Sequence, residues 1–114
     1  MKYSYEGIGA GSATFEAASP VEGQVVKLDA SGAAAPCSSG DVFCGVCSAV
    51  RNGVCGVQLD GLCTVSYSGT TAPTVGYCTL TADGSGGVSV VTTGGRSYLV
   101  AAVDSTAATC VIKL

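Results

Sequence analysis

Cysteine is the residue type in this chain with the clearest capacity for chemistry. Seven cysteines occur among 114 residues that include no histidine. Two of them form the string Cys44-Gly45-Val46-Cys47, a spacing used in metal sites and in thiol–disulfide couples. Because the count is odd, disulfide pairing within the chain would leave one thiol over. The cysteines therefore suit metal binding, disulfide formation, or burial as small apolar side chains.

A β-hairpin is predicted around Asn52-Gly53. This dipeptide lies between two apolar-rich runs, 42–50 and 54–65. Both central residues of a type I′ turn need a positive φ, which Asn and Gly tolerate best. A two-residue turn here places Arg51 opposite Val54 and gives the hairpin one apolar and one mixed face, as a half-buried hairpin requires.

The same register distributes the cysteines between the two faces. It places Cys44, Cys55 and Cys63 on the apolar face and Cys47 on the mixed one. Side chains three residues apart in a regular strand point to opposite sides, so Cys44 and Cys47 cannot hold one metal ion without a bend or bulge. No second Cys-x-x-Cys is present to complete a zinc site. We expect mostly free thiols and no cofactor; the weaker candidates for metal or disulfide chemistry are Cys37, Cys44, Cys47 and Cys55.

Few residues suggest catalysis. Without histidine the chain cannot form an ordinary Ser–His or Cys–His nucleophile pair. The aspartates lie mostly at expected turns, where Asp commonly accepts hydrogen bonds from nearby backbone. The run 83–87 is glycine-rich but lacks the Gly-Lys-Ser/Thr ending of a phosphate-binding loop. We therefore expect a non-enzymatic protein.

Short strand-like runs separated by turn residues predict the fold class. The 17 glycines interrupt helical periodicity throughout. We expect an all-β fold, a small barrel or sandwich of short antiparallel strands joined by hairpins. A second hairpin at Gly94-Gly95 would place Val90 opposite Leu99. Residues 1–20 are expected to form an N-terminal arm or a loosely packed first strand, followed by a single β-domain at 21–114.

The expected core follows from the residues that share apolar faces. In the last strand, Cys110, Ile112 and Leu114 lie on one face by alternation. The whole predicted core is Val26, Leu28, Val42, Cys44, Val46, Val57, Leu59, Val88, Val90, Leu99 and Ile112.

The composition limits the class of partner. Five Lys and Arg are scattered among eight Asp and Glu, so no basic patch is available for nucleic acid. No apolar run reaches the roughly 18–20 residues that span a bilayer. Residues 1–6 lack the apolar core of a signal peptide, so we expect synthesis and retention in a reducing cytoplasm. Only 11% of residues are charged, which indicates either a surface covered by a partner chain or one made polar by Ser, Thr and Gly.

Several strings in this chain resemble small all-β proteins of tailed bacteriophages and prophages of Gram-positive bacteria, some of which are head decoration or capsid-stabilising proteins. The resemblance covers roughly residues 20–114. The strings are Gly23-Gln24-Val25-Val26-Lys27-Leu28, Gly40-Asp41-Val42-Phe43-Cys44-Gly45-Val46, Val57-Gln58-Leu59-Asp60-Gly61, Tyr67-Ser68-Gly69, Pro73-Thr74-Val75-Gly76-Tyr77, Ala82-Asp83-Gly84-Ser85-Gly86-Gly87-Val88 and Tyr98-Leu99-Val100-Ala101-Ala102-Val103-Asp104.

The resemblance implies symmetric assembly on a capsid lattice, commonly as trimers, with no catalytic residues. The major capsid protein would then be the partner and the virion the final location. The cysteine richness departs from that family and leaves a thiol-based metal-binding or disulfide-forming interaction module as the alternative. A carbohydrate-binding β-domain is a further hypothesis, but the absence of Trp and an aromatic content of only 6% count against it. The expected interface residues are Tyr3, Tyr5, Phe15, Phe43 and Cys47.

Overall fold

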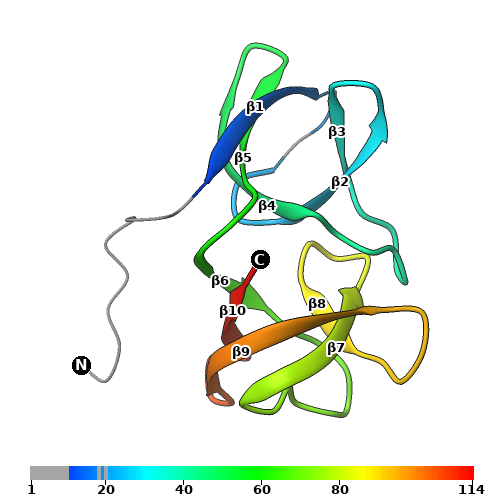
Figure 1. The fold of residues 1–114 in the computed structure, drawn as a ribbon, viewed down its shortest axis with the longest axis vertical. Coiled ribbons are helices and arrows are strands. Elements are labelled where there is room, and N and C mark those ends of the chain that lie inside the picture. Colours follow the sequence, from blue (N-terminus) through cyan, green and yellow to red (C-terminus); the bar gives the residue numbers. More distant parts are fainter. Residues whose placement is uncertain (1–10, 18, 20) are drawn as a thin grey trace.

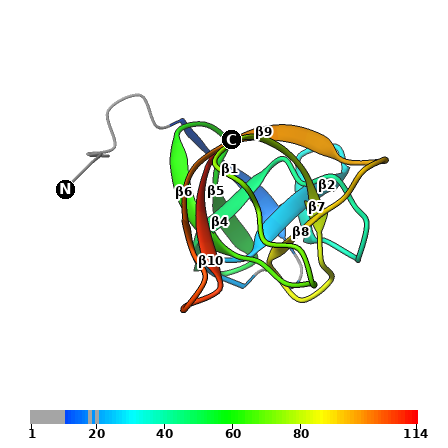
Figure 2. The ribbon, with the colours of Figure 1, turned by 90° about the horizontal axis from the view of Figure 1, so that it is seen from below.

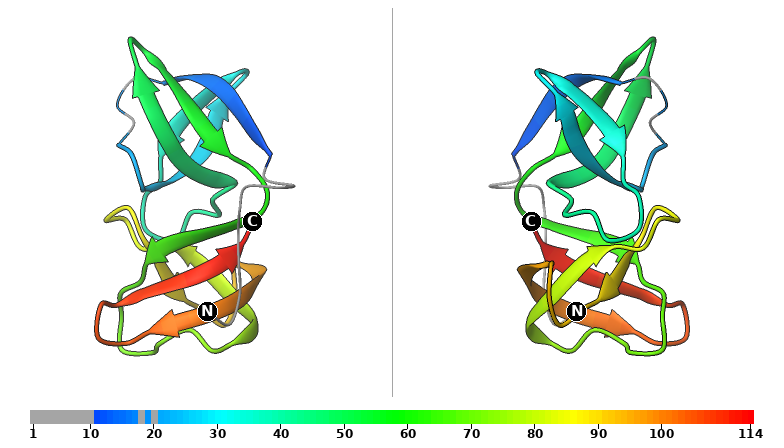
Figure 3. Two further views of the ribbon diagram at one scale, coloured as in Figure 1. Left: turned by 90° about the vertical axis from the view of Figure 1, so that its left-hand side faces the viewer. Right: turned by 90° about the vertical axis from the view of Figure 1, so that its right-hand side faces the viewer.

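The described part of the chain contains ten short strands, which form two β-structures stacked along the long axis of the molecule (Figures 1 and 3). The computed structural model describes residues 11–17, 19 and 21–114, and none of these residues is helical. The predicted all-β class, a small barrel or sandwich, is therefore confirmed. The strands are β1 (Ser12–Ala17), β2 (Val25–Ala30), β3 (Ala33–Pro36), β4 (Gly45–Arg51), β5 (Val54–Gln58), β6 (Leu62–Ser66), β7 (Gly76–Ala82), β8 (Val88–Val90), β9 (Arg96–Asp104) and β10 (Thr109–Lys113).

The first five strands close into a barrel in the order β1-β3-β2-β4-β5. Strand β1 completes the closure, because it runs parallel to β3 and antiparallel to β5. It lies in the 1–20 segment for which an arm or a first strand was expected; residues 1–10 of that segment are outside the described residues.

The last five strands form a curled antiparallel sheet in the order β6-β10-β9-β7-β8. Its two ends approach each other, since Tyr67 bridges to Val88 and the Ser68 N–H donates to the Val88 carbonyl over 2.9 Å. The sheet is therefore almost a second barrel, as the view along the stack in Figure 2 shows.

The first predicted hairpin is confirmed, with one difference. Asn52 and Gly53 have φ values of 46° and 80°, and Arg51 lies opposite Val54. A β-bulge between Cys47 and Ala49 then shifts the register by one residue. The shift moves Cys47 to the inner face, so the prediction that it lies on the mixed outer face is wrong.

The second predicted hairpin is wrong. Strands β8 and β9 do not pair with each other, because β7 lies between them: Leu80 faces Val90 on one side and Arg96 on the other. Residues 91–95 instead cross over β7 beside Thr79 and Leu80, where a Cβ on Gly95 would come within 2.8 Å of the Leu80 carbonyl oxygen. A Gly-Gly pair marks a chain reversal without specifying that the two strands become neighbours.

The predicted core is confirmed in part. The face of β10 that carries Cys110, Ile112 and Leu114 is buried as expected. Val26, Val46, Val57, Val88 and Ile112 are buried, and Cys44, Val90 and Leu99 are half-buried. Leu28, Val42 and Leu59 are exposed, because a bulge follows Leu28 and the other two lie in connections outside the strands.

Residues 37–44, between β3 and β4, form a joining segment that packs onto the second half, in addition to the chain connection at 59–61. Phe43 lies between β3 and β4 and is fully buried in the core of the second half. The Tyr98 ring stacks on Phe43 with 4.5 Å between ring centroids, and the Tyr98 hydroxyl donates to the Phe43 carbonyl over 2.6 Å. Val25 and Val46 belong to the same core, so the first barrel contributes residues to the packing of the second half.

Candidate functional site

The cysteines are all within the described residues and all are free thiols, gathered in three neighbourhoods. Cys37 and Cys44 are the first and last residues of the joining segment, and Cys44 is among the groups that raise the pKa of Cys37, after burial and Asp41. Cys47 and Cys55 lie together in the core of the first barrel. The third neighbourhood is on the inner face of the second half and consists of Cys63, Cys78 and Cys110.

Burial makes five of these thiols poor nucleophiles. It raises the pKa of the Cys63 thiol to about 12 and the pKa values of Cys37 and Cys110 to about 11. Burial also raises the pKa values of Cys44 and Cys47. Because the thiolate is the form that attacks and binds metal, these environments favour a packing role over a reactive one.

The candidate metal ligands do not converge. Cys47 and Cys55 lie within the core of the first barrel, Cys37 packs against the core of the second half, and the Cys44 thiol donates a weak hydrogen bond to the Val26 carbonyl over 3.6 Å. Within residues 11–17, 19 and 21–114, no group of three or more His, Cys, Asp or Glu side chains could hold a metal ion.

Of the five expected interface residues, the three that the structure describes are buried or half-buried. Tyr3 and Tyr5 lie outside the described residues, and Phe15 packs against the core of the first barrel. Phe43 and Cys47 are 0% and 1% exposed in the single chain, so neither side chain is presented on its surface, and their place at an interface stays a prediction. The stacking on Tyr98 buries Phe43, and the β-bulge turns Cys47 inward.

The outer face of the second half carries an apolar row that the sequence reasoning missed. The strand registers align Tyr77, Leu99, Lys113 and Leu62 across β7, β9, β10 and β6. Tyr77 is 77% exposed and Val75, just before β7, is 71% exposed. Alternation along β7 was the available signal, because Cys78, Leu80 and Ala82 point inward and thus leave Tyr77 outward.

The one charge in this row is paired. The Lys113 ammonium lies 3.3 Å from the Asp60 carboxylate. The pKa of Asp60 is lowered by the backbone N–H of Gly61 and by Lys113. The next row across the same face, Thr64, Val111 and Ala102, is uncharged and lines a hollow of about 210 Å³, at whose margin lies the charged Asp104. Tyr77 and this hollow together form what we term the outer face.

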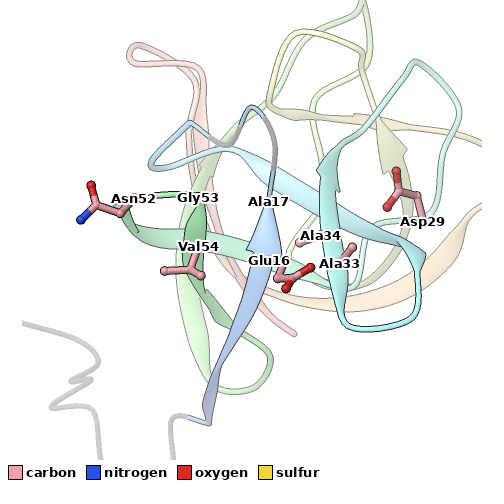
Figure 4. A pocket seen from close by; sticks show the side chains of 8 residues that line it. All are labelled: Glu16, Ala17, Asp29, Ala33, Ala34, Asn52, Gly53 and Val54. Carbon is pink, nitrogen blue, oxygen red and sulfur yellow. The ribbon is translucent and has the colours of Figure 1, made fainter.

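A second hollow opens at one end of the first barrel, with a volume of about 530 Å³. Figure 4 shows small side chains at its base, with the carboxylates of Glu16 and Asp29 on separate strands. Strand β3 lies between the strands that carry these two acids, so they do not form a close carboxylate pair. The lining consists of Glu16, Ala17, Asp29, Ala33, Ala34, Asn52, Gly53 and Val54.

The comparisons with known proteins give no family for this chain. No family model, no curated protein and no solved structure matches it. Among the described residues, no helix is long and apolar enough to cross a membrane.

Proposed function

We propose that this chain is a non-enzymatic phage structural protein that decorates and stabilises a capsid by self-assembly and by binding the capsid surface. The observation that carries the proposal is the outer face, where Tyr77 is the most exposed large apolar side chain of the described residues; Val75, just before β7, is the next most exposed. Tyr is enriched at protein interfaces because one side chain offers both apolar area and a hydrogen-bonding hydroxyl. The resemblance of residues 20–114 to phage decoration proteins supports the same function.

The shape of the outer face suits contact between copies. Tyr77 protrudes at β7, and the hollow over Thr64, Ala102 and Val111 lies on the same face. A protruding residue and a hollow at different places favour head-to-tail contact, which closes into a ring when the rotation permits. A homotrimer is the first expectation, with the major capsid protein as the other partner and the virion as the location.

The electrostatics of the face support burial against a partner. Lys113 is already neutralised by Asp60, so covering this row would not leave an isolated cation without a partner. The surrounding Thr and Ser side chains can exchange water for hydrogen bonds across an interface.

Sedimentation equilibrium and co-sedimentation with capsids of the encoding phage test the proposal. Tyr77→Ser removes the protruding ring, and Ala102→Leu fills the hollow; each is expected to weaken assembly or capsid binding by tenfold or more. Val21→Ser is the matched control, because Val21 is also exposed but lies outside the outer face. A wild-type chain that stays monomeric at millimolar concentration and does not bind capsids would refute the proposal.

A further inference from the structure

The β-bulge in the first barrel brings two sequence-separated thiols onto one inner face. Without the bulge, strand alternation places Cys47 on the opposite face from Cys55. With it, Cys47 faces Val57, two residues along β5 from Cys55. The two cysteines are thus diagonal neighbours across an antiparallel strand pair.

Their surroundings hold both side chains in place. Cys47 and Cys55 are each 1% exposed and belong to the same core cluster. The Cys47 thiol also donates a weak hydrogen bond to the Ala49 carbonyl, with 3.7 Å between sulfur and oxygen. The pKa of Cys47 is raised by burial and then by the charge of Cys55, in keeping with the closeness of the two sulfurs.

We propose that Cys47 and Cys55 are a disulfide pair that closes when the chain folds in the presence of a low-molecular-weight disulfide. The Cys47 thiolate attacks one sulfur of oxidised glutathione, breaks its S–S bond and releases one glutathione thiolate. The Cys55 thiolate then attacks the mixed disulfide and releases the second glutathione. Two protein thiols are oxidised and one glutathione disulfide is reduced, while the two thiol protons pass to the released thiolates.

Folding, rather than the folded state, is the stage at which closure is fast. In the folded barrel both thiols are buried and the pKa of Cys47 is raised, so little accessible thiolate is present. In the unfolded chain both thiols are open to solvent. The hairpin turn at Asn52-Gly53 then brings them together through the short connection 48–54.

This pair is favoured over the similar one in the second half. Cys63 and Cys110 are also diagonal neighbours, on β6 and β10. They are joined by the long segment 64–109, whereas Cys47 and Cys55 are joined by 48–54. Because the intervening segment is shorter, loop-closure entropy alone makes contact between Cys47 and Cys55 roughly tenfold more favourable than contact between Cys63 and Cys110.

The use of such a cross-link, though not its chemistry, rests on the proposed function. A virion protein is made in a reducing cytoplasm and then meets an oxidising medium. A disulfide across β4 and β5 would then reinforce the first barrel outside the cell.

Peptide mapping of the whole chain tests the pair. Reduced, unfolded wild-type protein is refolded with reduced and oxidised glutathione, alkylated, and digested with trypsin without reduction. Cleavage after Arg51 separates the two cysteines, so the expected product is a disulfide-linked pair of peptides 28–51 and 52–96. Its mass should be lower by two hydrogen atoms than the sum of the two peptides with Cys47 and Cys55 as free thiols. Fragmentation of the linked species assigns the bond to Cys47 and Cys55.

Variants sharpen the assignment. Cys47→Ser is expected to abolish the linked species, and Cys44→Ser, in the same peptide, to preserve it. The folded wild-type protein exposed to the same buffer is expected to form the link at least tenfold more slowly. Alkylation of both Cys47 and Cys55 after refolding, or a link through other cysteines, would overturn the inference. The wild-type mapping needs no variant to fold and no capsid, so its outcome is independent of the proposed function.

Discussion

The two halves of the molecule bury very different side chains. The core of the first barrel is built from small residues, namely Ala17, Val26, Ala34, Cys47, Cys55 and Val57, with Phe15 half-buried beside them. The core of the second half contains Phe43, Leu80, Tyr98 and Ile112, all with 1% exposure or less. Because hydrophobic stabilisation grows with the apolar area removed from water, the second half is the more stable part. The first barrel is then expected to open first.

The largest loss of stability is expected from a substitution in the core of the second half. Leu80→Ala removes a fully buried side chain and should lower the free energy of unfolding by about 3–4 kcal/mol. Because Phe43 ties the joining segment to this core, the loss should destabilise both halves. Chemical denaturation followed by circular dichroism measures the change, and Leu28→Ala, at an exposed position, is the control. A loss below about 1 kcal/mol would contradict a dominant second core.

A matching change in the first barrel should act locally. Val57→Ala truncates a fully buried side chain, with an expected loss of about 2 kcal/mol. Hydrogen exchange should show faster exchange of the β4 and β5 amides, with those of β7 and β9 little changed. Equal acceleration in both halves would show that they unfold as one unit.

The connection between the halves is tested by Tyr98→Phe. The substitution keeps the ring stacked on Phe43 but removes the hydroxyl that donates to the Phe43 carbonyl over 2.6 Å. A buried carbonyl left without this donor should cost about 1–2 kcal/mol. The expected signature is a lower denaturation midpoint together with faster exchange in residues 41–46. Unchanged stability would mean that the Tyr98 hydroxyl does not help to hold the joining segment.

Local signals in the sequence predicted local structure well. Asn52-Gly53 fixed its turn because the φ values of a type I′ turn leave few alternatives, and alternation in 110–114 correctly predicted the buried face. The β-bulge at Ser48 was not predictable, since nothing in the alternation marks an extra residue, and it reversed the expected orientation of Cys47. The order of β7, β8 and β9 was likewise missed, because pairing beyond adjacent strands is decided by packing of the whole core.

The candidate site was less predictable than the fold. Tyr77 could have been placed outward from alternation alone, but its alignment with Leu99 and Leu62 depends on the order of four strands. The closeness of Cys47 and Cys55 depends on the bulge. Both features arise from non-local register, which local turn and strand patterns do not specify.

The smallest effect concerns the ion pair that ties the first barrel to the joining segment. The Asp41 carboxylate lies 2.6 Å from the Lys27 ammonium and accepts a hydrogen bond from the Ser38 N–H over 2.9 Å. The pKa of Asp41 is lowered by Lys27 and then by Ser38. Because the pKa of Asp41 is lower in the folded than in the unfolded state, its ionised carboxylate stabilises the fold. This stabilisation is fully present above the unfolded-state pKa and is lost as the pH falls through the folded-state pKa. Both side chains are about one-third exposed, at 34% and 31%, so solvent screening keeps the effect small.

The measurement compares wild type with Asp41→Asn in denaturation experiments from pH 6 down to pH 2.5. The wild-type advantage at pH 6 should shrink towards zero as Asp41 becomes protonated. Lys27, whose pKa is raised from 10.5, stays charged over this whole range and cannot produce the change. In a Lys27→Gln background the same Asp41→Asn substitution should cost less at pH 6, because only the Ser38 hydrogen bond remains to be lost. A wild-type advantage that is constant with pH would show that Asp41 acts through shape rather than charge, and that its ion pair with Lys27 does not help to hold the joining segment on the first barrel.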